Sequence, residues 1–313
     1  MRLAIDFGGT NLKLGLVDTD ASFVDSSEIA LENLSPGKEF IAALLESIDH
    51  FLAGRQPELV AMASKGGVDI PNALVASDIG AGRYLMGINL RKKFESHYNI
   101  PFILDNDARA YALGEYNFGA GKGAKTLVCI TLGTGVGSAL LQNGKAYYCD
   151  DPVGGLLGGH LSIDRNGIPC NCGNRGCLER YVSASALHEI INKKFPELMG
   201  TDQDPIAGFF EQANREVDGP LRQELNLFIE NLSIGLVNII HAYGTDTIVI
   251  GGGVAKSADK YLPAVRKRVT EMAWTTLDGG VKIKPATLAS KAALLGMAFH
   301  PFLTEINQNN KGE

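Results

Sequence analysis

The strongest constraint in this sequence is a pattern that occurs twice: an apolar strand, a turn rich in glycine and threonine, and a second apolar strand. The first copy lies near residues 2–17 and the second near residues 126–141. Apolar residues that alternate or run continuously on both sides of a glycine turn are typical of a β-hairpin. The turns read Gly8-Gly9-Thr10 and Gly133-Thr134-Gly135-Val136-Gly137. The repeat predicts a duplicated α/β fold.

A stretch of Gly, Ala and Lys from Gly119 to Lys125 separates the two copies. We therefore predict an N-terminal α/β lobe over residues 1–119 and a C-terminal α/β lobe over residues 120–313. Within the second lobe, Pro220 and Gly244 bracket a long helix, because proline suits the first turn of a helix and glycine its end. We also expect a final helix at about 292–302 that packs back on the first lobe.

Charge and hydropathy exclude several classes of protein. The chain carries 29 Lys and Arg against 35 Asp and Glu, a net charge of −6, and it lacks the basic field of nucleic-acid-binding proteins. No uninterrupted apolar run reaches the roughly 18 residues that a membrane span needs. Asp6 stands where a signal peptide would have its apolar core. We expect a cytoplasmic protein with neither a nucleic acid nor a membrane as partner.

The two turns are candidate phosphate-binding loops. Glycines allow backbone N–H groups to approach a phosphate closely, and Thr10 adds a hydroxyl donor. Asp6, at the end of the first strand, is placed to orient Mg²⁺ or its waters. Each turn alone could be an ordinary hairpin turn, but two equivalent turns favour a pair of loops that bind one polyphosphate. The stretch 119–126 resembles a Walker A loop, but Ala124 replaces the required second glycine and a helix precedes it.

A cluster of metal-ligand residues follows the second hairpin. His160, Cys170, Cys172 and Cys177 have the spacing H-x9-C-x-C-x4-C, with asparagines and glycines between the cysteines. Thiolates this close in a cytoplasmic chain more often bind Zn²⁺ than form disulfides. One His and three Cys complete a closed tetrahedral site, so the predicted zinc is structural. The alternative is a loop of reduced thiols. Cys129, in an apolar strand, is predicted to be a core residue.

Three further features have both a functional and a structural interpretation. Asp107, preceded by Asn106, could be a general base, or the pair could only cap the helix that follows. Glu179 could bind a ligand or only suit the first turn of a helix. Gly251-Gly252-Gly253 could let a nucleotide lie against the backbone or only form a tight turn. The other histidines, His300 among them, are expected to serve packing without partners.

Together these residues resemble the ROK family of sugar kinases, within the actin/hexokinase-like superfamily. The resemblance extends from Asp6 to about Met297, and its most specific part is the run from Cys170 to Glu179, CNCGNRGCLE, which follows Gly159-His160. It implies a two-lobed, duplicated ribonuclease H-like α/β fold with a cleft between the lobes. It also implies an ATP-dependent kinase for a hexose or hexose derivative, with Mg²⁺ accompanying ATP and a structural Zn²⁺, in a homodimer or higher homo-oligomer.

The resemblance also implies roles for individual residues. Asp107 would be the catalytic base and Asn106 would hold sugar hydroxyls. His160 would bind zinc through one ring nitrogen and face the sugar with the other, and Glu179 would accept sugar hydroxyl bonds. The implied sugar-binding residues are Gly66, Asn106, Asp107, His160 and Glu179. The implied nucleotide-binding residues are Asp6, Gly8, Gly9, Thr10, Lys13, Thr131, Gly133, Thr134, Gly135, Gly251, Gly252 and Gly253.

Two positions depart from the family pattern. The family usually has a sugar-binding Glu three residues before the zinc-binding His, and this chain has Leu157 there. Loss of one buried hydroxyl contact commonly costs about 1–3 kcal/mol, which is enough to change the preferred sugar or to weaken all of them. The family's Pro-Gly turn reads Lys65-Gly66 here, which brings a cation to the sugar-side loop.

Two other functions are consistent with the resemblance. A sugar-responsive regulator would carry a helix-turn-helix ahead of the first phosphate loop, and we expect none because that loop starts at Asp6. A sugar-binding protein without catalysis is made possible by Leu157. The presence of Asp6, Asp107 and both turns favours the kinase.

Overall fold

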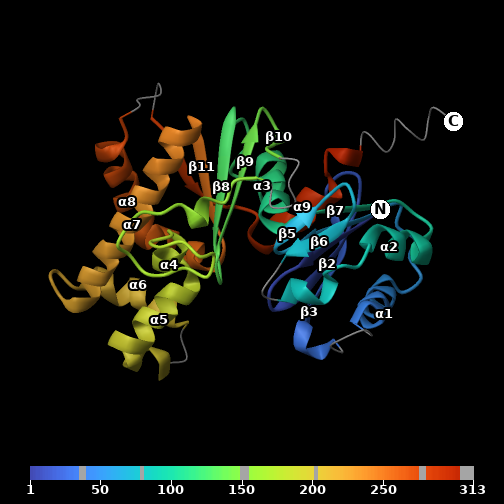
Figure 1. Ribbon diagram of the computed structural model, residues 1–313, viewed down its shortest axis with the longest axis horizontal. Helices are drawn as coiled ribbons and strands as arrows, with labels where there is room; N and C mark the ends of the chain where they lie inside the picture. The colour runs from blue at the N-terminus through green and yellow to red at the C-terminus, as the bar shows by residue number, and fades with distance from the viewer. Residues whose placement is uncertain (35–39, 78–80, 149–154, 201–203, 275–279, 304–313) are drawn as a thin grey trace. The chain divides into compact units, whose positions relative to one another are not determined.

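The computed structural model describes residues 1–34, 40–77, 81–148, 155–200, 204–274 and 280–303. Contacts between residues divide the chain into two compact units. Unit 1 comprises residues 1–122, 144–155 and 290–313, and unit 2 comprises residues 123–143 and 156–289 (Figure 1). Residues 144–155 and the C-terminal segment are thus grouped with unit 1, which differs from two continuous ranges that meet at residue 119.

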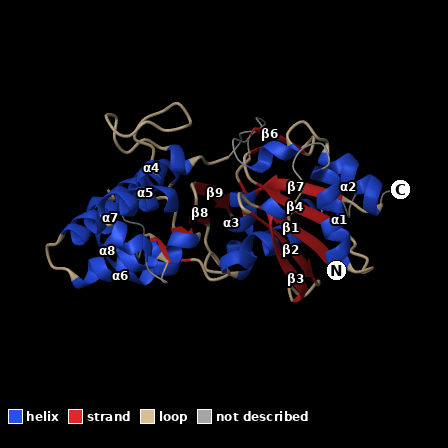
Figure 2. Cartoon of the chain, turned by 90° about the horizontal axis from the view of Figure 1, so that it is seen from below, coloured by secondary structure: helices blue, strands red, loops and turns tan. Residues whose placement is uncertain are grey.

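Unit 1 is built on a mixed sheet with the strand order β3-β2-β1-β4-β7. Strands β1, β2 and β3 are antiparallel neighbours, whereas β1, β4 and β7 run parallel to one another. Figure 2 shows this sheet with α1 and α2 on one side and α3 on the other. The elements are β1 Arg2–Phe7, β2 Asn11–Val17, β3 Phe23–Ala30, α1 Phe40–Leu52, β4 Val60–Ser64, β5 Gly67–Asp69, β6 Leu74–Ser77, α2 Leu90–Tyr98, β7 Phe102–Asn106, α3 Asp107–Phe118 and α9 Ala292–Ala298.

Successive side chains of β1 point to opposite faces of this sheet. Leu3, Ile5 and Phe7 are fully buried in one hydrophobic core with the apolar residues of α1 and α2. The intervening side chains of β1, which include Asp6, belong to the opposite face, since successive residues of a strand point to opposite sides. Asp6 therefore reaches the carboxyl end of β1 on the face away from that core.

Helices α3 and α9 pack so closely that their contact requires glycine. A Cβ atom on Gly114 of α3 would overlap the backbone of Ala292, and one on Gly296 of α9 would overlap the backbone of Ala110. The C-terminal helix is in this way held against the helix that begins at Asp107.

Unit 2 repeats the arrangement, with a second sheet in the order β10-β9-β8-β11-β12. Strands β8 and β9 form an antiparallel hairpin, and β8, β11 and β12 run parallel. The two sheets share one strand order, and β2-β1-β4-β7 and β9-β8-β11-β12 have the same relative directions, so the duplicated α/β fold is confirmed. The elements of unit 2 are β8 Thr126–Leu132, β9 Val136–Gln142, α4 Glu179–Val182, α5 Ala184–Lys194, α6 Pro205–Arg215, α7 Pro220–Tyr243, β11 Thr247–Gly251, α8 Ala258–Met272 and β12 Lys282–Pro285. The edge strand of this sheet, β10 Lys145–Ala146, belongs to the residues grouped with unit 1.

The long helix α7 packs beside α8 within unit 2 (Figure 1). Pro220 stands at its first turn and Gly244, at its end, has a left-handed conformation with φ 58°, as the sequence predicts. Among the described residues it is the one helix whose length and hydropathy would allow it to cross a membrane. Its residues Leu225, Leu232 and Leu236 are fully buried in the core of unit 2, which is the usual setting of such a helix in a packed domain.

Candidate functional site

The parallel strands of unit 1 end together and bring three distant parts of the sequence to one edge. Asp6 of β1 pairs in register with Ala63 of β4, and Ala63 pairs with Asp105 of β7. The residues that follow these strands therefore emerge side by side. Ligands in sheets of this kind are usually bound at the carboxyl ends of the strands. The edge gathers Asp6, Gly8, Gly9, Thr10, Lys65, Gly66, Asn106 and Asp107, and Lys13 of the neighbouring strand joins them through Asp6.

Asn106 both caps α3 and holds the residues beside it. Its Oδ1 accepts hydrogen bonds from the backbone N–H of Ala108 at 3.0 Å and of Arg109 at 3.3 Å. Its Nδ2 donates to the carbonyl oxygen of Gly66 at 3.2 Å and to Asp107 Oδ1 at 3.0 Å. The capping interpretation of Asn106 is thus confirmed. The same amide also ties the Gly66 turn to Asp107.

Asp107 is partly buried and bonded on one side only. Its Oδ1 accepts from Ala108 N at 2.8 Å and from Asn106 Nδ2. Every hydrogen bond that the described residues give this carboxyl goes to Oδ1, so Oδ2 remains able to take a proton from a bound hydroxyl. Burial and the nearby charge of Asp6 raise the pKa of Asp107 to about 6, although Ala108 N–H, Lys65 and Arg109 act in the opposite direction. A carboxyl with a pKa in this range suits proton abstraction near neutral pH.

Asp6 adds a second carboxyl to this edge. Burial raises its pKa, and the ammonium of Lys13, 3.5 Å away, partly offsets that effect. The charge of Asp6 raises the pKa of Asp107, so a divalent cation coordinated by oxygen would relieve this repulsion. The donor chemistry of Asp6 therefore fits Mg²⁺ held directly or through water.

The first glycine turn lies next to these carboxyls. Gly8 N–H donates to the carbonyl oxygen of Asn11 at 3.0 Å and closes the hairpin, while Gly9 and Thr10 are exposed. A Cβ on Gly8 would stand 3.1 Å from the Asn11 oxygen, so glycine keeps the turn tight. The exposed N–H groups and hydroxyl of this turn are donors that suit phosphate oxygens.

Behind Asn106 and Asp107 lies a buried polar network that the sequence did not reveal. Asp105 is fully buried, and its Oδ1 accepts from Arg109 Nε at 2.6 Å and from Asn106 N at 2.6 Å. Its Oδ2 accepts from the Tyr148 hydroxyl at 3.0 Å and lies 2.9 Å from His300 Nε2. Burial acts to raise the pKa of Asp105, but the bond from His300 and the charges of Arg109 and His300 hold it below its usual range.

The expectation that the remaining histidines have no partners is therefore wrong for His300. His300 lies 195 positions from Asp105 in the sequence, and no local pattern links the two. His97 is also paired, with its Nε2 2.9 Å from Asp49 Oδ2. Sequence proximity of Asp105 to the candidate base was the only available signal for this network.

The second glycine turn, in unit 2, is supported by Glu179. Val136 N–H donates to Glu179 Oε2 at 2.8 Å, and a Cβ on Gly135 would collide with the same oxygen. Gly133 N–H donates to the Gly135 carbonyl at 3.0 Å and keeps the turn closed, while Thr134 is exposed. Glu179 begins α4, as the helix-start interpretation predicts, and its carboxylate also supports the turn between β8 and β9.

The glycines after β11 lie beside this turn. Gly251 pairs in register with Thr131 of β8. Gly252 has φ 85°, and a Cβ there would collide with the backbone of Leu132, so the position requires glycine. Gly253 is exposed. Unit 2 thus brings together Thr131, Gly133, Thr134, Gly135, Gly251, Gly252 and Gly253.

The four predicted metal ligands also come together in unit 2. The ligand atoms of His160, Cys170, Cys172 and Cys177 lie within 4.8 Å of one another. His160 Nδ1 is 3.7 Å from Cys170 Sγ, and Cys172 Sγ is 3.6 Å from Cys177 Sγ. With zinc–sulfur bonds of about 2.3 Å, a tetrahedral ion separates its ligand atoms by nearly these distances. Burial and the neighbouring thiols raise the pKa of Cys177 to about 12, an effect that a bound divalent cation would reverse.

The two other cysteines of the sequence are Cys129 and Cys149. Cys129 is buried in β8, which confirms the core prediction, and Cys149 lies outside the described residues. Leu157, where the family usually has Glu, is 51% exposed in unit 2. Its side chain is therefore not part of the hydrophobic core and is accessible to a ligand.

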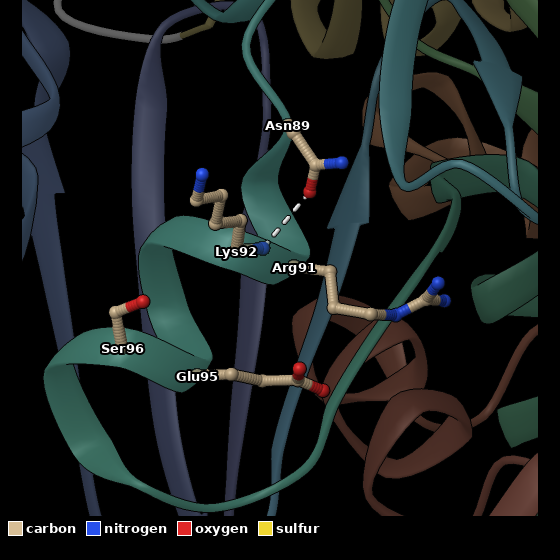
Figure 3. Close-up of a pocket in the computed structure, with 5 residues that line it drawn as sticks. All are labelled: Asn89, Arg91, Lys92, Glu95 and Ser96. Atoms are coloured by element: carbon tan, nitrogen blue, oxygen red, sulfur yellow. Dashed lines mark hydrogen bonds between the residues drawn. The ribbon is translucent and has the colours of Figure 1, made fainter.

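A separate surface depression lies on α2, lined by Asn89, Arg91, Lys92, Glu95 and Ser96 (Figure 3). Asn89 caps this helix by accepting from Lys92 N at 2.9 Å, and Arg91 donates to the carbonyl oxygen of Pro71. None of its residues belongs to the carboxyl edge described above. Glu95 in addition accepts from the backbone N–H of Phe102 at 3.2 Å, so three of the five polar side chains serve the local structure.

Comparison with known proteins identifies relatives along nearly the whole chain. The model of the ROK family matches residues 2–300. A glucokinase of Halalkalibacterium halodurans is 28% identical over 94% of this chain and 92% of its own length. A xylose repressor of Bacillus subtilis is also 28% identical, over 95% of this chain and 75% of the repressor. Sugar kinases and a sugar-named repressor thus both align with this chain.

A solved structure of a ROK family protein also has the fold of this chain. The ROK family glucokinase from Streptomyces griseus, in complex with glucose and AMPPNP, superposes with a TM-score of 0.75. The two sequences are 26% identical, and the alignment covers 95% of this chain and 97% of that one. The actin/hexokinase-like α/β fold expected from the sequence is confirmed.

Proposed function

The chain belongs to the ROK family, and from this premise we propose that it is an ATP-dependent kinase that phosphorylates a hydroxyl group of a hexose or hexose derivative. Glucokinase relatives along nearly the full length of the chain support sugar kinase activity in general. The observation that carries the proposal is the carboxyl of Asp107, with a pKa of about 6, beside Asp6 and the glycine turn of unit 1.

In the proposed reaction Asp107 accepts the proton of the sugar hydroxyl. The hydroxyl oxygen then forms a bond to the terminal phosphorus of ATP, and the bond from that phosphorus to its bridging oxygen breaks, so that ADP leaves. Backbone N–H groups of Gly9 and Thr10 and the Thr10 hydroxyl donate to phosphate oxygens and offset their charge, while Gly8 keeps the turn tight. Mg²⁺, when bound with ATP, neutralises phosphate charge, and Asp6 would hold it.

The remaining residues of the proposed site are assigned by the family resemblance. In unit 1, Lys13 and Gly66 serve nucleotide and sugar binding, and Asn106 holds sugar hydroxyls. In unit 2, the turn from Thr131 to Gly135 binds phosphate and the Gly251–Gly253 turn binds the nucleoside. His160 and Glu179 bind the sugar from the loop that zinc holds in place. We also propose a cytoplasmic homodimer or higher homo-oligomer.

We expect kcat to fall with acidity below about pH 6. A general base works only when deprotonated, and the pKa of Asp107 is raised to about 6. The rate should therefore be nearly constant above pH 7 and drop about tenfold for each unit below the pKa. Initial rates at saturating ATP and sugar between pH 4.5 and 8.5 measure this. A rate that stays constant to pH 4.5 would remove Asp107 from the proton transfer.

The experiment that tests the kinase itself measures ADP release with a panel of hexoses, amino sugars and sugar acids. At least one of them should stimulate ADP release above the rate with ATP alone. Leu157 cannot supply a carboxylate to a sugar hydroxyl, so the preferred sugar is expected to differ from that of relatives with Glu at this position.

A second candidate is a sugar-binding protein without turnover, which the xylose repressor relative and Leu157 favour. Calorimetric binding of sugars without any ADP release would support that function instead. ADP release with any member of the panel would exclude it.

A further inference from the structure

Lys65 is a cation at the carboxyl edge of unit 1 to which the proposed mechanism gives no role. It follows β4 directly, between the ends of β1 and β7. Its backbone N–H donates to the carbonyl oxygen of Phe7 at 3.4 Å, and its carbonyl oxygen accepts from Ser64 Oγ at 3.2 Å. The backbone of Lys65 is therefore held against the strand that leads into the first glycine turn.

The side chain of Lys65 extends to that turn. Its Nζ lies 3.9 Å from the position that a Cβ on Gly9 would occupy. Gly9 is exposed, and Lys65 is only partly buried, so the ammonium is accessible to a ligand bound at the turn. An ammonium 3.9 Å from where a Gly9 Cβ would stand lies close enough to the turn to contact a phosphate oxygen that the turn binds.

Lys65 differs from the other lysine at this edge in how its charge is paired. The other lysine, Lys13, is paired with Asp6 at 3.5 Å. Lys65 forms no ion pair among the described residues, so its charge is not consumed by a neighbouring carboxylate. Its positive charge nevertheless lowers the pKa of Asp107, which places it within electrostatic range of the candidate base. Lys65 therefore lies near both the phosphate turn and the group that takes the proton.

We propose that Lys65 binds the terminal phosphate of ATP and neutralises charge on the phosphoryl group as it is transferred. This inference rests on the kinase function proposed above. Lys65 forms no covalent bond in the step: the sugar oxygen bonds to phosphorus, its proton passes to Asp107, and the electron pair of the broken bond leaves with ADP. An ammonium that contacts the transferred group lowers the barrier because it meets charge that water would otherwise solvate.

A carboxylate or phosphate of an anionic sugar offers Lys65 the same chemistry as ATP does. The position of Nζ beside Gly9 favours the nucleotide phosphate, because Gly9 belongs to the turn assigned to phosphate and not to the Gly66 turn assigned to the sugar. The two possibilities can be told apart by binding. If Lys65 contacts ATP, its loss weakens ATP binding, and if it contacts an anionic sugar, its loss weakens sugar binding.

The test compares Lys65→Met, which removes the charge and retains the length, with Lys65→Arg, which retains the charge. Lys92→Met is the matched control, because Lys92 lines the depression on α2 (Figure 3) and is not one of the residues gathered at the carboxyl edge. Calorimetry gives the affinities for ATP and ADP with Mg²⁺, and steady-state kinetics give kcat and both KM values. The pH dependence of kcat is measured for each variant.

Lys65→Met should lower the affinity for ATP about tenfold and leave the affinity for ADP unchanged, because only ATP carries the terminal phosphate. Its kcat should fall by roughly 10²-fold, the lower end of the effect of removing one such donor. The acid limb of its pH profile should move to higher pH, since the cation that lowers the pKa of Asp107 is lost. Lys65→Arg should recover most of the rate, and Lys92→Met should match the native chain.

Other outcomes overturn the inference. A raised KM for an anionic sugar, with unchanged ATP affinity and kcat, would assign Lys65 to the sugar. Equal ATP affinities in the native chain and Lys65→Met would show that Lys65 does not contact the terminal phosphate. A native chain without turnover refutes the kinase proposal, and the ATP-to-ADP affinity ratio still decides the role of Lys65 separately.

Discussion

Replacement of Asp107 with Asn is expected to lower kcat by roughly 10²–10⁴-fold while leaving the affinity for ATP unchanged. Asn has the shape of Asp, and its Oδ1 can still accept from Ala108 N and Asn106 Nδ2. The amide cannot take a proton, so only the transfer step is affected. Stopped-assay ADP release and calorimetric ATP binding on the same preparation measure the two quantities.

The stability of this variant separates a catalytic loss from misfolding. The pKa of Asp107 is raised from 3.8 to about 6 in the folded state. Its contribution to stability is thus greatest below pH 3.8 and declines as pH rises through about 6. Asp107→Asn removes that decline, so at pH 8 the variant should be at least as stable as the native chain.

The matched control is Asp20→Asn. Asp20 is an exposed residue of unit 1 whose Oδ1 accepts a hydrogen bond from Ser22 N, and the amide oxygen of Asn can accept the same bond. It should retain full activity and native stability. An Asp107→Asn enzyme with native kcat would contradict the assignment of the base. A variant that is inactive but less stable at pH 8 would indicate a folding role.

Loss of the metal should destabilise unit 2 and weaken sugar binding. We expect elemental analysis to find one zinc per chain, and chelation to lower the free energy of unfolding by about 4 kcal/mol if free zinc is normally about 1,000 times its dissociation constant. The loop loses its shape because the three cysteines and His160 no longer share a bound zinc ion. Glu179, two residues after Cys177, is then no longer held against Val136 N.

Cys172→Ser tests the same site without a change in the core. Cys172 is exposed, so the substitution removes a ligand but leaves no cavity. The variant should contain less than one zinc, unfold at lower temperature and show a raised KM for the sugar. Cys129→Ala is the control, since Cys129 is buried in β8 outside the cluster, and it should retain its zinc. A native protein without zinc would refute the structural metal.

The duplicated halves, both glycine turns and the four-residue metal cluster could be predicted because each depends on residues close together in sequence. A hairpin needs only its two strands and its turn, and a thiolate cluster within eight positions needs only a tight loop. The same local reasoning could not separate capping from catalysis at Asn106 and Asp107, because a cap and a site at a helix start use the same residue types.

Sequence alone therefore determined the repeated α/β pattern, its turns and the metal-ligand set. Tertiary structure decided which groups surround them: Asp105 with His300, 195 positions away, Glu179 with the turn at Val136, and Lys65 beside Gly9. The reason is that these contacts depend on which strands become neighbours, on how α9 packs on α3 and on where the start of α4 meets the β8–β9 turn. Those choices result from burial summed over a whole core, and no short stretch of sequence records them.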